Sequence, residues 1–411
     1  MSLQLSKSAI SSYFQIGWPT VGHCIKAAHD LLEPDPSLRL LGLKKFCIDE
    51  TSYAKGHKYI TVVYDMEKLQ VVWVHDGHGL EVFELFANAL TPEQRSEVEV
   101  VAGDGARWID SGTSMFFPNA SRCIDIFHLV GWCNEALDEV RKDVMQDASS
   151  EYQKTEKAFL DTLDLTSNAI QQAEKELVEA ASNLDKERMN VLEAYIKLLK
   201  SYNNPDIKPS KKSKLKKKFI KFLSPDQLEV LAQLKKLSKT LKNARYAVTK
   251  NPENRTACQN DKIDLIASSA PILYLAYLLK EALRSIVHME HVDGAAHELD
   301  RWIDKALNSG IAPFVALAEK ISRHRENLLN SIRFKANSSQ SESCNALIKS
   351  VIRTAKGFRN LNNLFAMIYL KCSTLVIPLT NRPQYTPEQK AELHQKAKEY
   401  RQKMAQKNKV A

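Results

Sequence analysis

Long apolar segments are missing from this sequence. The longest apolar run, residues 270–279, ends after ten residues at Lys280, whereas a membrane-spanning helix needs about 20 residues. Residues 1–7 also lack the charged stretch followed by an apolar stretch that marks a secretory signal. We therefore expect a cytoplasmic protein that does not contact membranes.

Paired cysteines are missing as well. The seven cysteines are scattered along the chain, and no two have the Cys-x-x-Cys spacing that is typical of structural zinc sites. We expect reduced thiols, most of them small core residues, and no structural zinc.

The length and composition are those of a large globular protein. With 411 residues, the chain is expected to form two or three domains. Its 44% hydrophobic and 26% charged residues exclude a wholly disordered or collagen-like protein. Lysine and arginine outnumber aspartate and glutamate by 58 to 49, which gives a pI near 9.0. Such an excess favours polyanionic partners, and nucleic acid is the first candidate.

Hydrophobic patterning divides the chain into a mixed front part, a long helical middle and a short helical return. In the front part, runs rich in Val, Ile, Tyr and Trp alternate with turn residues and one amphipathic stretch. They predict the order strand, strand, strand, helix, strand, helix, strand, with strands at 44–49, 58–65, 71–76, 97–102 and 122–127 and the first helix at 80–90. Residues 128–330 have helical spacing almost throughout, with a flexible break at 203–213 and no predicted strand.

Two aspartates are predicted to lie at strand ends. Asp49 ends the first predicted strand, and Asp104 directly follows the fourth, between two glycines. Side chains at the carboxyl ends of strands in open α/β sheets converge on ligands. Two carboxylates held close together need a divalent cation between them, and oxygen ligands select Mg²⁺ or Mn²⁺. Either aspartate alone is more typical of a turn or a helix cap, so the metal hypothesis needs further support.

A third acidic candidate lies near the C-terminal end. Residues 337–356 have the pattern of a capped helix that Gly357 ends. At about 100° per residue, apolar residues 344, 347, 348, 351, 352 and 355 fall on one face. The opposite face carries Glu342, Asn345, Lys349, Arg353 and Lys356. This stripe would set one metal ligand beside phosphate contacts, although its periodicity alone is more typical of a solvated face.

These motifs together resemble a known family. In the order found in insertion-sequence transposases of the ISL3 family, the sequence contains Ile48-Asp49-Glu50-Thr51-Ser52-Tyr53, Gly103-Asp104, Asp125-Ile126-Phe127-His128, Ser341-Glu342-Ser343-Cys344-Asn345 and Gly357-Phe358-Arg359-Asn360. Three stretches of the helical middle also resemble the family: Asn251-Pro252-Glu253-Asn254, Ala276-Tyr277-Leu278-Leu279-Lys280-Glu281 and Ser309-Gly310-Ile311-Ala312-Pro313-Phe314. The resemblance spans about residues 10–375.

The resemblance implies an α/β plus α architecture: a ribonuclease H-like mixed sheet with a large all-helical insertion before the last of three catalytic carboxylates. These carboxylates map to Asp49, Asp104 and Glu342. They would bind two Mg²⁺ (or Mn²⁺) ions, roughly 3.5–4 Å apart, that activate a water or a 3′-hydroxyl to attack a DNA phosphodiester. Asp125 and His128 also match a family motif. They are candidates for a group that supports the ligands or contacts substrate, with a structural hydrogen-bonded pair as the alternative.

Polar and basic residues at two places are candidates for DNA contacts. The predicted C-terminal helix and the motif after it contribute Asn345, Lys349, Arg353, Lys356 and Arg359. A lysine-rich run at 208–221 contributes Lys211, Lys212, Lys216 and Lys217, for which a solvated linker is the alternative. Residues 18–26 resemble the second half of a helix-turn-helix that precedes the catalytic domain in the family.

The expected domains follow from these assignments. We predict a partial helix-turn-helix-like segment at 1–36, the first part of the catalytic domain at 37–130, a helical insertion at 131–330 with a lysine-rich linker near 203–221, a return to the catalytic domain at 331–376 and a charged tail at 377–411. Family members carry an upstream zinc-binding cysteine cluster that this sequence lacks, so we expect an amino-terminally truncated copy.

The sequence therefore predicts a DDE transposase that cleaves and transfers DNA strands to move an insertion sequence. The expected partners are double-stranded DNA, both element ends and target, and a second copy of the chain in the DNA complex. The expected location is the nucleoid. A catalytically silent DNA-binding remnant with a regulatory role is the first alternative, and a helical scaffold with an unrelated acidic site is the second.

Overall fold

The computed structural model describes residues 5–336, 339–355, 358, 360–375 and 395, and the side chains of 339–342 lie outside this description. The chain divides into two compact units. Unit 1 comprises Met1–Leu43, Glu50–His78 and Ser341–Ala411, and unit 2 comprises Lys44–Asp49 and Gly79–Gln340. No helix in the described part of the chain has both the length and the apolar character needed to cross a membrane.

A five-stranded mixed sheet has the strand order β3-β2-β1-β4-β5. Its strands are β1 (Lys45–Ala54), β2 (Lys58–Asp65), β3 (Gln70–Asp76), β4 (Val100–Gly103) and β5 (Ser121–Ile124). Strand β4 pairs in parallel with β1 and with β5, whereas β2 and β3 are antiparallel. The five predicted strands are therefore confirmed, in the predicted order along the chain.

The ends of three strands were predicted wrongly. The fifth strand, predicted to reach residue 127, ends at Ile124, because Asp125 caps a helix that begins at Ile126. Strand β1 does not end at Asp49 but continues to Ala54, because Thr51 is buried and the turn at Gly56 and His57, both with positive φ, comes only after it. Residues 97–99 are not part of the fourth strand. Thr91 starts a short helix, α4 (Pro92–Ser96), with a capping box, and this helix delays β4 to Val100.

Helices α3 (Leu80–Asn88) and α5 (Arg107–Phe116) pack together in unit 2. Phenylalanines fill the core beneath them: the ring of Phe46 from β1 lies edge-on to Phe83, Phe86 and Phe117, with centroids 5.1–6.4 Å apart. Edge-to-face rings are a favourable aromatic arrangement, so this cluster holds the first strand against the two helices.

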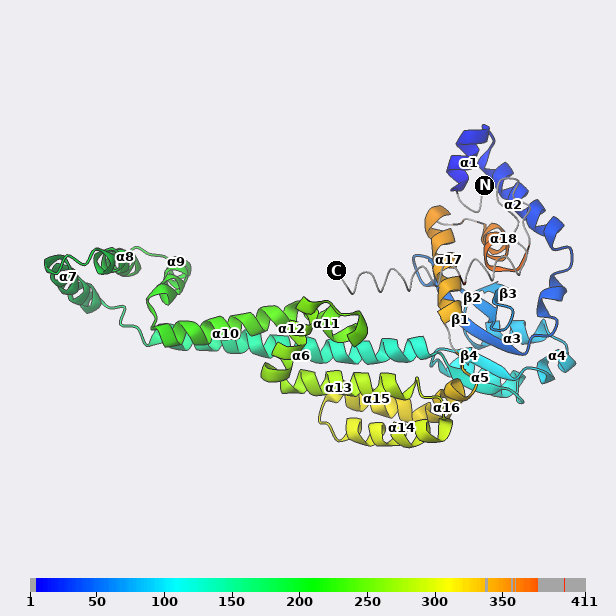
Figure 1. Cartoon of the computed structure of the whole chain (residues 1–411). Coiled ribbons are helices and arrows are strands. Elements are labelled where there is room, and N and C mark those ends of the chain that lie inside the picture. The colour runs from blue at the N-terminus through cyan, green and yellow to red at the C-terminus, as the bar shows by residue number, and fades with distance from the viewer. Residues whose placement is uncertain (1–4, 337–338, 356–357, 359, 376–394, 396–411) are drawn as a thin grey trace. The chain divides into compact units, whose positions relative to one another are not determined.

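A 36-residue helix, α6 (Ile126–Asp161), follows β5 directly, and α10 (Pro225–Lys242) lies alongside it (Figure 1). The remaining helices of unit 2 are α7 (Ser167–Ser182), α8 (Lys186–Tyr202), α9 (Pro209–Lys216), α11 (Arg245–Thr249), α12 (Ala257–Ser269), α13 (Pro271–Ile286), α14 (Val292–Leu307), α15 (Ala312–Arg323) and α16 (Arg325–Arg333). The predicted helical middle is confirmed for the residues that the structure describes. The predicted break at 203–213 is shorter than expected, because Pro209 begins α9.

Two cores stabilise the helical part of unit 2. The larger includes Leu137, Leu273, Leu299 and Phe314, and the smaller joins Leu160 of α6 to Leu199 of α8 and Phe219. Helix α16 returns the chain to the sheet, where Ser331 Oγ donates to the Ile124 carbonyl at 2.7 Å. The predicted boundary at 130/131 falls inside the continuous helix α6.

Unit 1 contains α1 (Lys7–Phe14), α2 (Trp18–Leu32), the 3₁₀ helix η1 (Pro36–Leu40), most of α17 (Ser339–Ala355) and α18 (Leu361–Cys372). Helix α18 packs on α2 and on β3. Its Tyr369 hydroxyl accepts a hydrogen bond from the Val74 amide at 2.9 Å, and the Arg39 guanidinium lies 3.6 Å from the centre of the same ring. Arg39 also pairs with Glu33 at 2.7 Å, so a buried polar cluster joins α2, η1 and α18.

Candidate active site

Three aspartates lie at the same level of three neighbouring parallel strands in unit 2. Ile48 of β1 is the register partner of Gly103 in β4, and Gly103 is in turn the partner of Ile124 in β5. Each of these residues is directly followed by an aspartate: Asp49, Asp104 and Asp125. Neighbouring strands lie about 4.8 Å apart, so the backbone brings the first two aspartates side by side.

Gly103 permits this close register. A β-carbon added at this position would lie 2.9 Å from the Ile48 carbonyl oxygen and 2.9 Å from Ile109 Cδ1. Both neighbours are fully packed, since Ile48 and Ile109 are at most 1% exposed. Any larger side chain would therefore push β1 and β4 apart at the level of the aspartates.

The buried side chain of Arg122 fixes the backbone at the end of β4. Its Nε donates to Asp110 Oδ1 at 2.9 Å, and its two terminal nitrogens donate to the carbonyl oxygens of Gly103, Cys123 and Asp104. A planar guanidinium with five N–H donors suits such a cluster of acceptors. Arg122 therefore sets the direction in which the chain leaves β4 at Asp104.

Asp104 is half-buried and forms a turn at the start of α5. Its Oδ1 accepts a hydrogen bond from the Ala106 amide at 2.9 Å. Its Oδ2 accepts none within the part of the chain that the structure describes. Asp49 is likewise half-buried. Two partly exposed carboxylates on adjacent strands form an oxygen donor set that fits a hard divalent cation.

Asp125 begins helix α6. It is only 5% exposed, and its Oδ1 accepts from the Phe127 amide at 2.8 Å, as the cap of the helix. Its Oδ2 lies 3.9 Å from His128 Nε2. The two residues predicted as a pair are thus near each other, and the aspartate stabilises the first turn of α6.

Lys320 of α15 was not predicted from the sequence. Its Nζ lies 3.3 Å from the centre of the Trp132 ring. Trp132 packs tightly on the glycine after Asp104, because a β-carbon on Gly105 would lie 2.5 Å from Trp132 Cη2. Burial lowers the pKa of Lys320, and the negative charge of Asp104 acts in the opposite direction. The helical part of unit 2 therefore supplies a cation beside Asp104.

His324, one helical turn after Lys320, also lies near the turn that contains Asp104. Its Nδ1 lies 3.8 Å from Asp110 Oδ2, and its ring is tilted against Trp132 with centroids 6.2 Å apart. Burial lowers the pKa of His324, although the charge of Asp110 opposes this effect. No local motif marks Lys320 or His324, because they approach Asp104 only through the packing of α15 on α6.

Glu342, the third predicted carboxylate, belongs to helix α17. The predicted helix at 337–356 is confirmed as Ser339–Ala355, but the side chain of Glu342 lies outside the described residues. Among the residues described, no three His, Cys, Asp or Glu side chains are grouped closely enough to hold a metal ion. The complete triad therefore stays a prediction.

The two faces of α17 differ as expected, with one exception. Cys344, Ile348 and Val351 are buried, and Lys349 and Arg353 are exposed. Leu347, predicted on the apolar face, is 43% exposed, because it lies at the edge of the buried arc. Of the other predicted DNA contacts on this segment, Asn345 is half-buried, and Lys356 and Arg359 lie outside the described residues.

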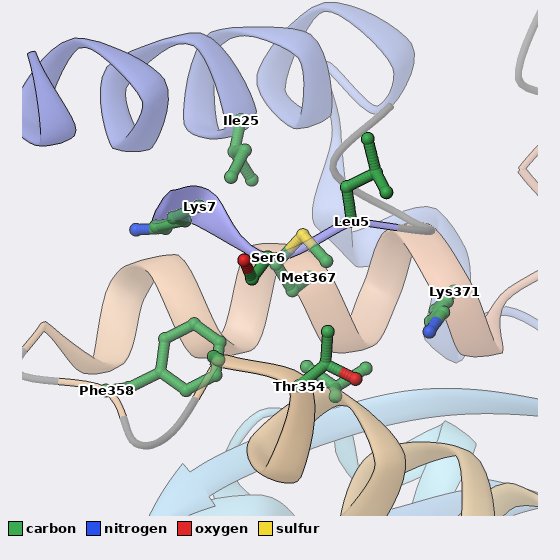
Figure 2. Close-up of a pocket in the computed structure, with 10 residues that line it drawn as sticks. Leu5, Ser6, Lys7, Ile25, Thr354, Phe358, Met367 and Lys371 are labelled. Carbon is green, nitrogen blue, oxygen red and sulfur yellow. The ribbon is translucent and has the colours of Figure 1, made fainter. Parts of the chain in front are cut away.

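A small hollow of unit 1 lies between the N-terminal residues and helices α2, α17 and α18. Ser6 and Lys7 approach Thr354, Phe358 and Met367 there (Figure 2). Lys7 Nζ lies 5.8 Å from the centre of the Phe358 ring, and burial lowers the pKa of this lysine. These contacts anchor the C-terminal end of α17 to the start of the chain.

The predicted lysine run forms α9 and the 3₁₀ helix η2 (Lys217–Phe222). Two of its lysines pair with acids of α6: Lys216 with Asp161, and Lys217 with Glu156 at 3.7 Å. The Lys212 Nζ lies 4.7 Å from the centre of the Tyr202 ring. Lys211 is exposed and has no acidic partner among the described residues. Lys216 and Lys217 thus form ion pairs within the chain, and phosphate binding by the four lysines stays a prediction.

Comparison with known proteins decides the family. The profile of a family described as "Transposase", DDE_Tnp_ISL3, matches residues 46–243 and 213–368. The chain belongs to the ISL3 family of insertion-sequence transposases. It is 30% identical over 370 residues to the transposase for insertion sequence element IS1557 of Mycobacterium tuberculosis, covering 90% of this chain and 69% of that protein.

A second relative is more distant. The transposase for insertion sequence element IS1001 of Bordetella parapertussis is 22% identical over 363 residues, which cover 88% of this chain and 68% of that protein. No solved structure matches the chain. The first matched range of the family contains Asp49 and Asp104, and the second contains Glu342. The predicted family of this transposase is thus confirmed.

Proposed function

We propose that this transposase cleaves and joins DNA strands in a reaction that depends on Mg²⁺ or Mn²⁺ and on the carboxylates of Asp49, Asp104 and Glu342. The observation that carries the proposal is the equivalent position of the first two aspartates on neighbouring parallel strands. The strand order β3-β2-β1-β4-β5 supports the ribonuclease H-like fold that the family resemblance implies. The helices from α6 to α15 are then the helical insertion.

Asp49 and Asp104 would hold the metal together with Glu342. Two ions bound there would supply charge neutralisation and activate the attacking oxygen at the phosphodiester. The protein's own contribution is geometric. Arg122 and the Ala106 amide hold Asp104 in one orientation, and the register with Gly103 holds Asp49 beside it. Preorganised ligands of this kind need no rearrangement when the DNA arrives.

DNA is the substrate that the exposed basic residues of the chain favour. Lys320 places a cation beside Asp104, Lys349 and Arg353 are exposed on α17, and Lys211 is exposed on α9. Such residues contact phosphates without reading base sequence, and their contribution weakens as salt rises. We propose that they bind the element ends and the target, and that two copies of the chain act together on the two ends.

The test uses the purified full chain and a DNA fragment that carries the ends of its own element. Strand cleavage and joining are measured with Mg²⁺, with Mn²⁺ and with EDTA. The variants Asp49→Asn, Asp104→Asn and Glu342→Gln should each lose about a hundredfold or more in rate, since even groups that only support metal ligands contribute about 10- to 100-fold. Binding of the DNA should persist.

Glu50→Gln is the matched control. Glu50 neighbours Asp49 on β1, but alternate residues of a strand face opposite sides of a sheet, and its Oε1 lies 3.9 Å from His78 Nδ1. This variant should retain activity. If Asp49→Asn cleaves DNA as fast as the wild type does, the assignment is wrong. Salt-sensitive DNA binding with no metal-dependent product from the wild type would contradict the proposed activity as a whole.

A further inference from the structure

Helix α13 (Pro271–Ile286) exposes a stripe without charge. One side of the helix is buried in the larger core of unit 2 through residues such as Leu273, Ala276 and Leu283. The opposite side is exposed and consists of Pro271, Leu275, Leu278, Ala282 and Ser285, which we call the α13 stripe. Leu275 is 42% exposed, Leu278 is 45% exposed, and Ile272 beside them is 58% exposed.

The spacing of the α13 stripe is that of a helix-pairing seam. Its residues follow one another at steps of four, three, four and three, and this heptad spacing keeps side chains on the face that meets a partner helix. A solvated helix face normally carries charged residues, as the α14 surface does at Asp300, Arg301, Asp304 and Lys305. The stripe therefore fits contact with another helix better than contact with water.

The order of large and small side chains along the α13 stripe indicates which partner would fit it. The first half carries the large Leu275 and the second half the small Ala282 and Ser285, with Leu278 between them. In an antiparallel pair of identical helices with the two-fold axis close to Leu278, the stripe residue nearest to Leu275 is Ala282 of the other copy, and the one nearest to Pro271 is Ser285. Large side chains then meet small ones, as a symmetric interface requires. We propose that the α13 stripe packs against the α13 stripe of a second copy of this chain.

The charges around the stripe allow this contact. Glu281, at its edge, is already paired within the chain: its carboxylate lies 3.1 Å from Arg284 Nε and 3.4 Å from Arg255 Nη2, and Lys280 donates to it as well. Covering the stripe would thus leave no unpaired charge behind. The stripe itself carries no cation, which disfavours DNA as its occupant.

The expected affinity is modest. Stable interfaces bury about 1,200–2,000 Å² in total, and one pair of four-turn helices provides a small contact in comparison. We expect association at micromolar or higher protein concentration in the absence of DNA. The inference does not depend on the proposed catalytic activity, because it can be measured without DNA or metal.

Cysteine cross-linking tests the central contact. The exposed Cys24 and Cys258 are first replaced by serine in the full chain, and Leu278→Cys is added. Mild oxidation with a copper(II)–phenanthroline complex should convert this protein to a covalent dimer. Leu307→Cys, on α14 and 40% exposed, is the matched control and should remain monomeric. Equal cross-linking of both variants, or none with Leu278→Cys, would overturn the proposal.

A mixing experiment tests the antiparallel register. Chains with Leu275→Cys are combined with chains with Ala282→Cys and oxidised in the same way. The mixture should give more covalent dimer than either variant alone, since position 282 is the stripe position of the partner nearest to position 275. A parallel pair would instead cross-link each variant to itself and would refute the proposed geometry.

Sedimentation velocity gives an independent readout. The wild type should show concentration-dependent association at tens of micromolar, which Leu278→Glu abolishes and Leu278→Met retains. Leu278 is half-exposed, so glutamate there should leave the circular dichroism spectrum and the thermal midpoint unchanged. A wild type that stays monomeric over this range and does not cross-link excludes the interface, whatever the result of the DNA cleavage test.

Discussion

Asp49 and Asp104 occupy equivalent positions on two neighbouring parallel strands, because each directly follows one member of the register pair Ile48 and Gly103. This relationship does not depend on the rotamer of either side chain. It is set by backbone hydrogen bonds, by the absence of a β-carbon at Gly103 and by the hydrogen bonds that Arg122 donates to carbonyl oxygens at the end of β4. The two carboxylates are thus held together by the sheet itself.

Divalent metal should stabilise the fold through these carboxylates. We expect Mn²⁺ or Mg²⁺ to raise the thermal midpoint of the wild type, since a ligand at 100 times its dissociation constant stabilises a protein by about 2.7 kcal/mol. Asp104→Asn should lose this rise. Differential scanning fluorimetry with and without EDTA measures it, and Ca²⁺ and K⁺ serve as comparison ions. An identical rise in the variant would place the metal elsewhere.

Replacing Arg122 should destabilise unit 2. Arg122→Met removes the buried guanidinium, which donates to Asp110 and to the carbonyl oxygens of Gly103, Cys123 and Asp104. The Gly103 carbonyl keeps its bond from the Asp125 amide. Because the Asp110 side chain is 33% exposed, the expected loss is about 1–3 kcal/mol, the cost of a buried polar group left without its partner. Arg122→Lys should recover part of this loss, because an ammonium group cannot reach all the acceptors at once. Urea unfolding followed by circular dichroism gives the difference, and a loss below about 1 kcal/mol would contradict the described role.

Gly105→Ala should lower the free energy of unfolding, because the added methyl group would clash with Trp132. The added β-carbon would lie 2.5 Å from the indole, and overpacking of this kind typically costs about 1–3 kcal/mol. In a Trp132→Leu background the cost should shrink, and a double-mutant cycle measures the coupling. Gly131→Ala is the control: a β-carbon there meets nothing within 4 Å, so alanine in this helix should be neutral or stabilise by up to about 1 kcal/mol.

Lys320 should contribute to turnover rather than to folding. We expect Lys320→Met to lower metal-dependent DNA cleavage by about tenfold, the size of one charge-assisted contact of about 1.4 kcal/mol. Lys320→Arg should restore part of the rate. Lys305→Met removes an exposed lysine of α14 and is the control for net charge. If the three variants cleave DNA equally, Lys320 has no role at the phosphodiester.

His324 should make stability depend on pH. Burial lowers its pKa below the usual 6.5, so the unfolded chain binds a proton at this residue more readily than the folded chain does. Stability should therefore decrease as pH falls through about 6.5. His324→Gln should show a smaller fall in the thermal midpoint between pH 7.5 and pH 5.5. An unchanged pH profile would show that this histidine is not the group responsible.

Local sequence patterns were sufficient to predict much of the fold. The alternation of residues in β1–β5 predicted five strands in their true order, and helical periodicity predicted the burial of Cys344, Ile348 and Val351 in α17. These features depend on residues near in sequence, which is why they could be predicted. The prediction that Asp49 and Asp104 are brought together used the rule that ligands gather at strand ends. Only Asp104 follows the end of its strand, whereas Asp49 lies inside β1, and the two are neighbours because β1 and β4 pair in parallel.

Features that depend on long-range packing could not be predicted in this way. Arg122 and Lys320 have no distinctive neighbours in the sequence, and their importance comes from carbonyl groups and a ring that tertiary structure brings to them. Strand β1 extends beyond Asp49 because its turn comes only at Gly56. Leu347 is exposed because an apolar residue at the edge of a helical face is covered only if a neighbouring element reaches it.

Helix α6 also sets a length scale for the DNA complex. It follows the cap residue Asp125, which is level with Asp49 and Asp104, and ends at Asp161, which binds Lys216 of the lysine-rich segment. At about 1.5 Å per residue this helix is about 54 Å long, the rise of about 16 base pairs at 3.4 Å each. The length of α6 would thus fix a distance along the DNA. Phosphates bound by Lys211 would lie about one and a half turns of the duplex away from the phosphodiester at the proposed site.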